Sequence, residues 1–187
     1  EYARYFDLEP GQFPFYYSNR GHFNARLGND EQAVADLERA RQLMRRQQDD
    51  FDRRLAVTID MLLAWVRCRN GANGQSLLDE LGSEQSLLAR PREQTQLREA
   101  RATCLWQAGE TEPALDEIEA LVEAEPRPSG LVDAADRRIV QARMLADLDR
   151  PEQAATALEQ AESWFIEHGL TDHPLLERLR DQRRSLR

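Results

Sequence analysis

The sequence predicts an all-α fold built from stacked antiparallel helix pairs. Apolar residues recur at helical spacing in runs of roughly 12 to 18 residues, and short breaks rich in Gly, Asn, Asp or Pro separate these runs. Small residues recur at an interval of about 40 residues. Ala114 and Ala154 are 40 residues apart, and Ala33 lies 81 residues before Ala114, which is about twice that interval. Such spacing is typical of repeated helical hairpins that share one core.

The clearest helix pair lies within residues 17–40. We expect its first helix to end at Gly28, because Gly28-Asn29-Asp30 offers a left-handed stop followed by a helix N-cap. Gly21 and Ala33 would let the two helices approach closely, since the side chains at a crossing set the distance between helix axes.

This segment resembles the tetratricopeptide repeat, in which an aromatic residue, a small residue, a loop glycine, a second small residue and a large apolar residue follow in order. The matching residues are Tyr17, Gly21, Gly28, Ala33 and Leu37. Asn24 departs from the pattern at a position that is usually aromatic, and the interval of about 40 residues exceeds the standard 34. The resemblance implies irregular antiparallel helix pairs that stack into a right-handed superhelical array. The first helices of the pairs would line its concave surface.

The same pattern recurs twice further along the chain. One copy has Ala102 and Ala114 on either side of Gly109, and another has Ala142 and Ala154 on either side of the turn Asp149-Arg150-Pro151. A tandem array with a common core is the arrangement that such recurrence predicts.

A weaker copy is expected between these, with a first helix at 55–69, a loop at 70–74 and a second helix at 75–81. We therefore predict about four repeats plus a capping helix. The expected segments are a lead at 1–13, a repeat domain at 14–173 with repeats at about 14–50, 51–90, 91–130 and 131–169, and a C-terminal capping helix at 174–187. A helical linker into a further domain is the alternative for the last segment.

Composition argues against nucleic acid and membrane partners. The 25 basic residues, all of them Arg, are outnumbered by 34 acidic residues, and the formal charge of -9 repels phosphate backbones. No segment holds the roughly 20 apolar residues that cross a bilayer. The use of Arg without Lys indicates a GC-rich, bacterial genome. The chain begins at Glu1 rather than Met, which indicates either a processed protein or a part of a larger one, and we expect the latter. We also expect the chain to be soluble, with the cytoplasm favoured over the periplasm.

The function that the tetratricopeptide resemblance implies is a non-catalytic module that binds a peptide or partner domain within a larger bacterial signalling or regulatory protein. No phosphate-binding loop, zinc-protease motif or nucleophile elbow is present, and no cofactor is expected. Two alternatives stay open. One is a homo-oligomerisation module, and the other is a small helical metal-dependent enzyme that would use His168, Asp172 and His173.

The resemblance places the binding groove along the first helix of each pair. The expected groove residues are His22, Arg26, Trp65, Arg69, Thr103, Trp106 and Arg143. Phe15, Ser18 and Asp147 are expected near them. The alternative for Trp65 and Trp106 is that they fill space between repeats. We do not expect a site that binds the C-terminal carboxylate of a partner. Tetratricopeptide repeats of that class use Lys and Asn in the first helix, whereas Ser18 and His22 stand at those positions here and the sequence has no Lys.

The two cysteines, Cys68 and Cys104, lie inside helical patterns without metal-binding or redox spacing. We expect both to be small buried core residues. Whether they form a disulfide is left open.

Overall fold

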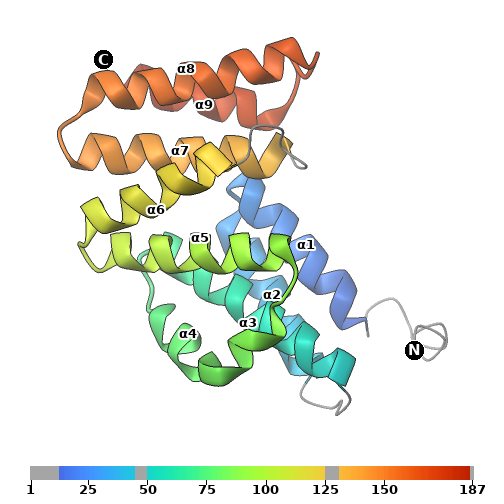
Figure 1. Cartoon of the computed structure of the whole chain (residues 1–187). Helices are drawn as coiled ribbons and strands as arrows, with labels where there is room; N and C mark the ends of the chain where they lie inside the picture. The colour runs from blue at the N-terminus through green and yellow to red at the C-terminus, as the bar shows by residue number, and fades with distance from the viewer. Residues whose placement is uncertain (1–12, 45–49, 125–130, 186–187) are drawn as a thin grey trace. The chain divides into compact units, whose positions relative to one another are not determined.

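The computed structural model describes residues 13–44, 50–124 and 131–185, and within them every regular element is a helix (Figure 1). The all-α class is therefore confirmed. None of the helices in these ranges is both long and apolar enough to cross a membrane. The elements are α1 (Pro14–Leu27), α2 (Asp30–Met44), α3 (Asp50–Arg69), α4 (Gln75–Leu81), a 3-10 helix η3 (Gly82–Leu87), α5 (Pro91–Gln107), α6 (Thr111–Ala124), α7 (Leu131–Asp147), α8 (Pro151–Glu167) and α9 (Pro174–Ser185).

The chain divides into two compact units, residues 1–104 and 105–187. The division falls inside α5, so that most of this helix belongs to unit 1 and its last three residues begin unit 2. The lead segment expected at 1–13 lies outside the described residues except for Phe13.

In unit 1, α1 and α2 form the hairpin expected from the sequence. Gly28 adopts a left-handed conformation with φ of 83°, and its N–H and that of Asn29 bind carbonyl groups in the last turn of α1. Gly21 faces α2 so closely that a Cβ there would lie 2.8 Å from Leu37 Cγ and 3.1 Å from the Ala33 carbonyl oxygen. The expectation that small residues allow this close crossing is confirmed.

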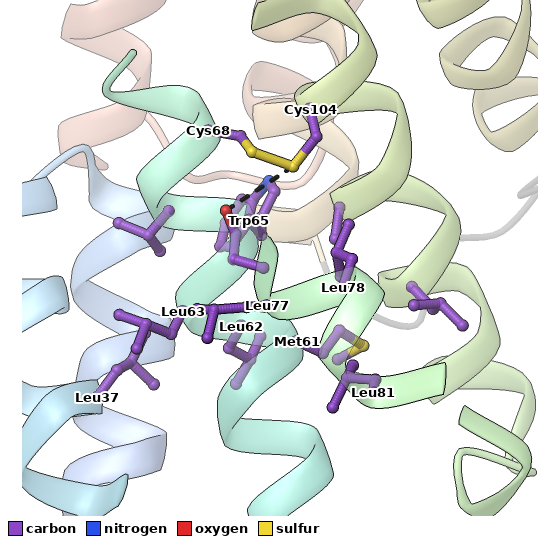
Figure 2. Packing of buried hydrophobic residues seen from close by; sticks show 14 of the residues in the cluster. Leu37, Met61, Leu62, Leu63, Trp65, Cys68, Leu77, Leu78, Leu81 and Cys104 are labelled. Carbon is purple, nitrogen blue, oxygen red and sulfur yellow. Dashed lines mark hydrogen bonds between the residues drawn. A yellow bond between two sulfur atoms is a disulfide. The ribbon is translucent and has the colours of Figure 1, made fainter. Parts of the chain in front are cut away.

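The main core of unit 1 lies around α3, which packs against α2 on one side and against α4 and η3 on another. Leucines from α3 and α4 meet there, as Figure 2 shows for Leu62, Leu63, Leu77 and Leu78. The loop at 70–74 and the helix at 75–81 are found as predicted. A 3-10 helix then follows α4, so that the second helix of this pair is short.

In unit 2, α6 packs against α7, α7 against α8, and α8 against α9, which also touches α7. The helix expected at 174–187 is described from Pro174 to Ser185. Its Leu175, Leu176 and Leu179 are buried, and each such burial contributes about 1.5–3 kcal/mol. Four arginines of α9 are partly or fully exposed: Arg178, Arg180, Arg183 and Arg184.

The turns of the three clear helix pairs share one hydrogen-bond pattern. At Gly28, Gly109 and Asp149 the residue has a positive φ, and its N–H and the next N–H bind carbonyls of the helix before it. Asp149 adopts this conformation with a φ of 58° although it is not glycine. Asp tolerates the left-handed region better than most residues do, which explains how this pair forms its turn without glycine.

Candidate interaction sites

Four of the predicted groove residues meet inside unit 1. His22 and Arg26 lie one turn apart on α1, and Trp65 and Arg69 lie one turn apart on α3, so each pair shares a helix face. The guanidinium carbon of Arg26 lies 4.2 Å from the centroid of the Trp65 ring, and that of Arg69 lies 5.1 Å from it. The His22 ring meets the indole edge-on at 6.1 Å. Two cations thus flank one aromatic ring.

Burial corrects the interpretation of three of these residues. Arg26, Trp65 and Arg69 are 2%, 3% and 7% exposed, so their side chains are core rather than the lining of an open groove. The alternative interpretation of Trp65, that it fills space in the core rather than contacting a partner, therefore fits its burial. Within the described residues its indole N–H has no hydrogen-bond partner.

Carboxylates compensate both buried guanidinium groups. Arg26 Nη2 donates to Glu99 Oε2 at 2.9 Å, and Arg26 Nη1 donates to Glu99 Oε1. Arg69 Nη2 donates to Asp30 Oδ1 at 2.7 Å and also to the carbonyl oxygen of Ala25. A planar guanidinium suits this two-point pairing, and a buried charge requires such a partner. Sequence reasoning missed Glu99, which lies among the exposed-looking charges of α5.

Two further side chains expected at or beside the groove are also buried. Thr103 is fully buried and donates from Oγ1 to the Glu99 carbonyl oxygen at 2.8 Å. Ser18 is 3% exposed. Burial excludes both from the surface that a partner could reach in this conformation.

Of the predicted groove residues, His22 in unit 1 and Trp106 and Arg143 in unit 2 are not buried. Trp106, near the end of α5, donates from Nε1 to Asp147 Oδ2 at 2.7 Å, and the Arg143 guanidinium carbon lies 4.9 Å from the Trp106 ring centroid. Trp106 and Arg143 are half-buried and Asp147 is exposed. These three residues, called here the Trp106 patch, place an aromatic ring, a cation and a carboxylate together at the surface of α5 and α7.

A second exposed group was not identified as a site from the sequence. Phe15, Tyr16 and Phe23 of α1 are 48%, 49% and 58% exposed, although Phe15 was expected near the groove. Tyr16 and Phe23 are seven residues apart and therefore share one helix face, a spacing that was available in the sequence. Exposed aromatic side chains of this size are typical of contact surfaces.

Arg20 and Asp36 join α1 to α2 beside these aromatic residues. Arg20 donates to both carboxylate oxygens of Asp36, at 2.8 and 2.5 Å. Burial raises the pKa of Asp36, but the hydrogen bonds from Arg20, Gln32 and Asn24 outweigh it and hold that pKa below 3.8. The hydrogen bond to Asp36 raises the pKa of Arg20 in turn. Asp36 is therefore a charged, hydrogen-bonded carboxylate at neutral pH.

The histidines considered for metal binding have other contacts. His168 Nδ1 lies 2.8 Å from the Trp164 carbonyl oxygen, and the His173 ring packs on Phe165 at 5.1 Å. His173 Nδ1 accepts the N–H of Leu175 at 3.2 Å. Among the described residues, no three His, Cys, Asp or Glu side chains are grouped so that they could hold a metal ion.

Cys68 and Cys104 are both 2% exposed, which confirms that they are core residues. They are also joined by a disulfide, with Cα atoms 4.9 Å apart, so the question left open by the sequence is answered in favour of the bond (Figure 2).

No family model, no curated protein and no solved structure matches this chain. The tetratricopeptide resemblance therefore depends on the residues quoted above and on the helix pairs themselves. Function has to be argued from the chain's own surfaces.

Proposed function

We propose that this chain is a non-catalytic interaction module, a tetratricopeptide-like array that binds a peptide segment or partner domain through the Trp106 patch. The observation that carries the proposal is the grouping of Trp106, Arg143 and Asp147 at the surface of unit 2. Trp and Arg are the side chains that most often dominate binding energy at protein interfaces. The right-handed superhelical arrangement of the pairs is part of the proposal.

The chemistry of the patch indicates what kind of segment would bind. An apolar side chain of the partner would lie against the indole of Trp106, where burial of apolar surface contributes most of the free energy. Arg143 and Asp147, which both contact this indole, would hydrogen-bond to backbone or polar groups of the partner and fix its direction. The formal charge of -9 favours a neutral or basic segment over an acidic one.

The test is capture of a partner by the purified chain, compared across matched variants. Trp106→Ala and Arg143→Ala should weaken capture, because each removes an anchor at the patch. Trp164→Ala and Arg180→Ala are the controls, since these residues lie on α8 and α9 and contact His168 and Glu162 instead. Thermal melting of every variant checks that it folds.

A partner retained by the wild type and both controls, and weakened at least about tenfold by both patch variants, supports the proposal. Equal retention by all five chains would remove the Trp106 patch from the binding site.

The second candidate function is self-association, and the exposed aromatic residues of α1 favour it. Phe15, Tyr16 and Phe23 would be covered in a homodimer, which removes apolar surface from water. Light scattering over a range of concentrations tests this candidate. A dimer in the wild type and a monomer in Phe23→Glu would support it, whereas a monomer at every concentration would rule it out.

A further inference from the structure

We propose that the disulfide between Cys68 and Cys104 is a shielded structural cross-link, so that unit 1 is built for an oxidising compartment and loosens when the bond is reduced. These are the two cysteines of the sequence, and the bond uses both. It joins α3 to α5 across a sequence separation of 36 residues.

The bond closes a segment that contains the two shortest helices described in unit 1. Between the two cysteines lie the loop 70–74, the seven-residue helix α4 and the six-residue helix η3. Helices this short are not stable alone in water, so their positions depend on packing against α3 and α5. A covalent bond between the two ends of this segment, Cys68 and Cys104, restricts the unfolded chain and so favours the folded one.

The bond also fixes the position of α3 relative to α5 where the buried charges lie. Trp65 precedes Cys68 by one turn on α3, and Glu99 precedes Cys104 on α5. Arg26 touches both Trp65 and Glu99, so its contacts require the two helices to keep their spacing. Reduction should therefore disturb the surroundings of Trp65.

Packing shields the sulfur atoms from reductants. A Cβ placed on Gly74 would lie 2.6 Å from Cys68 Sγ, which means that the backbone of the loop covers this sulfur. The N–H groups of Gly71 and Ala72 bind carbonyls of the last turn of α3 at 3.0 and 2.8 Å and hold the loop closed. A reductant can reach the bond only after this loop opens, so the reduction rate should follow local opening.

The chemistry of reduction is thiol–disulfide exchange. A thiolate of dithiothreitol attacks one sulfur, and the other leaves as a thiolate with the bonding electron pair. The second thiol of the reagent then resolves the mixed disulfide. Two electrons and two protons end on Cys68 and Cys104, and the reagent becomes a cyclic disulfide. The two sulfur atoms, no longer bonded, must move apart, and this separates the adjoining turns of α3 and α5.

The same redox chemistry indicates the cellular compartment in which the chain would keep this disulfide. Structural disulfides persist in the periplasm and outside the cell, whereas the cytosol keeps thiols reduced. The proposal therefore favours an oxidising compartment over the cytoplasm expected from the sequence.

The experiment uses the full chain purified without reductant. A chromogenic thiol assay in denaturant should find no free thiol before reduction and two after it. Reduction should lower the melting temperature by about 10 °C, and the native chain should react with dithiothreitol at least about ten times more slowly than the denatured chain. The control is the Cys68→Ala/Cys104→Ala variant. It should have the melting temperature of the reduced chain, and dithiothreitol should not change that temperature.

A Trp106→Phe/Trp164→Phe chain leaves Trp65 as the one tryptophan, and its emission should shift on reduction. Two free thiols in the untreated chain, or equal melting temperatures of the oxidised and reduced chains, would overturn the proposal. Equal reduction rates in the native and denatured chains would overturn the shielding. If the Cys68→Ala/Cys104→Ala variant does not fold, the melting temperatures of the oxidised and reduced wild type still test the proposal.

Discussion

Arg26 on α1 and Glu99 on α5, 73 residues apart in the sequence, form a two-point ion pair in which each side chain is 2% exposed. The same guanidinium group lies against Trp65, so Arg26 contacts α3 and α5 at once. A buried pair of this kind contributes little net stability over an apolar core, but loss of one partner leaves an uncompensated charge.

Glu99→Ala should therefore lower the free energy of unfolding of unit 1 by about 3–5 kcal/mol, because Arg26 loses both hydrogen bonds to its carboxylate. Urea unfolding followed by circular dichroism measures the change. Glu84→Ala is the matched control, since Arg53 and Glu84 form an exposed pair and its loss should cost less than about 1 kcal/mol. Similar small losses in both variants would contradict the structural role of the buried pair.

Gly21→Ala tests the close approach of α1 and α2. In an open helix this change would stabilise by roughly 0.5–1 kcal/mol, because Gly is a poor helix former. Here the new methyl group would meet Leu37 and the Ala33 carbonyl, so we expect a loss of about 1–3 kcal/mol in the free energy of unfolding. The sign of the change, measured by urea unfolding, decides between the two outcomes. A gain in stability would show that the helices are not in contact at this position.

The Arg20–Asp36 pair predicts a specific pH dependence. The pKa of Asp36 lies below its ordinary 3.8 in the folded chain, so the unfolded chain binds this proton first as the pH falls. The contribution of Asp36 to stability is complete above that ordinary value, and it is lost as the pH falls from there through the lower folded-state pKa.

The measurement is the free energy of unfolding of the wild type and Asp36→Asn between neutral pH and about pH 2. Asp36→Asn should be less stable than the wild type at neutral pH, and the difference should shrink in the acid range. Glu93, whose pKa is also lowered, titrates in both chains and cancels in the comparison. A difference that does not change with pH would contradict the assignment.

Gly74→Ala tests how the loop covers the disulfide. A Cβ at this position would lie 2.2 Å from the Ala64 carbonyl oxygen, which belongs to the backbone of α3 and cannot move away cheaply. We expect a loss of about 1–3 kcal/mol in the free energy of unfolding and faster reduction by dithiothreitol. Ala72→Ser in the same loop is the control, because Ala72 is exposed and Ser keeps the backbone N–H without the added freedom of Gly. Unchanged reduction kinetics in Gly74→Ala would mean that the loop does not shield the bond.

The helices and their turns could be predicted because their causes are local. Gly28 and Gly109 stop helices through the left-handed conformation, and the run Asp149-Arg150-Pro151 combines a tolerant residue with a proline that suits the first turn of α8. The small residues that recur at the predicted interval are all fully buried: Ala33, Ala102, Ala114, Ala142 and Ala154. Periodicity and turn chemistry need no knowledge of distant contacts.

The site could be predicted only in part, because burial of a charged residue depends on partners that are distant in the sequence. Arg is mostly exposed in proteins, so Arg26 and Arg69 were expected at a surface. Nothing near Arg26 in the sequence indicates Glu99 as its partner. His22, Arg26, Trp65 and Arg69 were all expected along one groove, and the structure brings these four together, although all but His22 are buried.

The disulfide between Cys68 and Cys104 could not be predicted from the sequence. Two cysteines 36 residues apart are compatible with a bond only if their helices meet at the right positions. That geometry depends on the packing of α4 and the loop before it, which bring the ends of α3 and α5 together. Helical periodicity predicts that both residues are buried but not that they touch.

The most direct test of the proposed function is the affinity of the captured partner for Trp106→Ala and Trp164→Ala, measured by calorimetric titration beside the wild type. The Trp106 patch predicts that Trp106→Ala raises the Kd at least about tenfold, while Trp164→Ala leaves it unchanged. Equal Kd values for the wild type and Trp106→Ala would contradict the claim that unit 2 binds its partner through this patch.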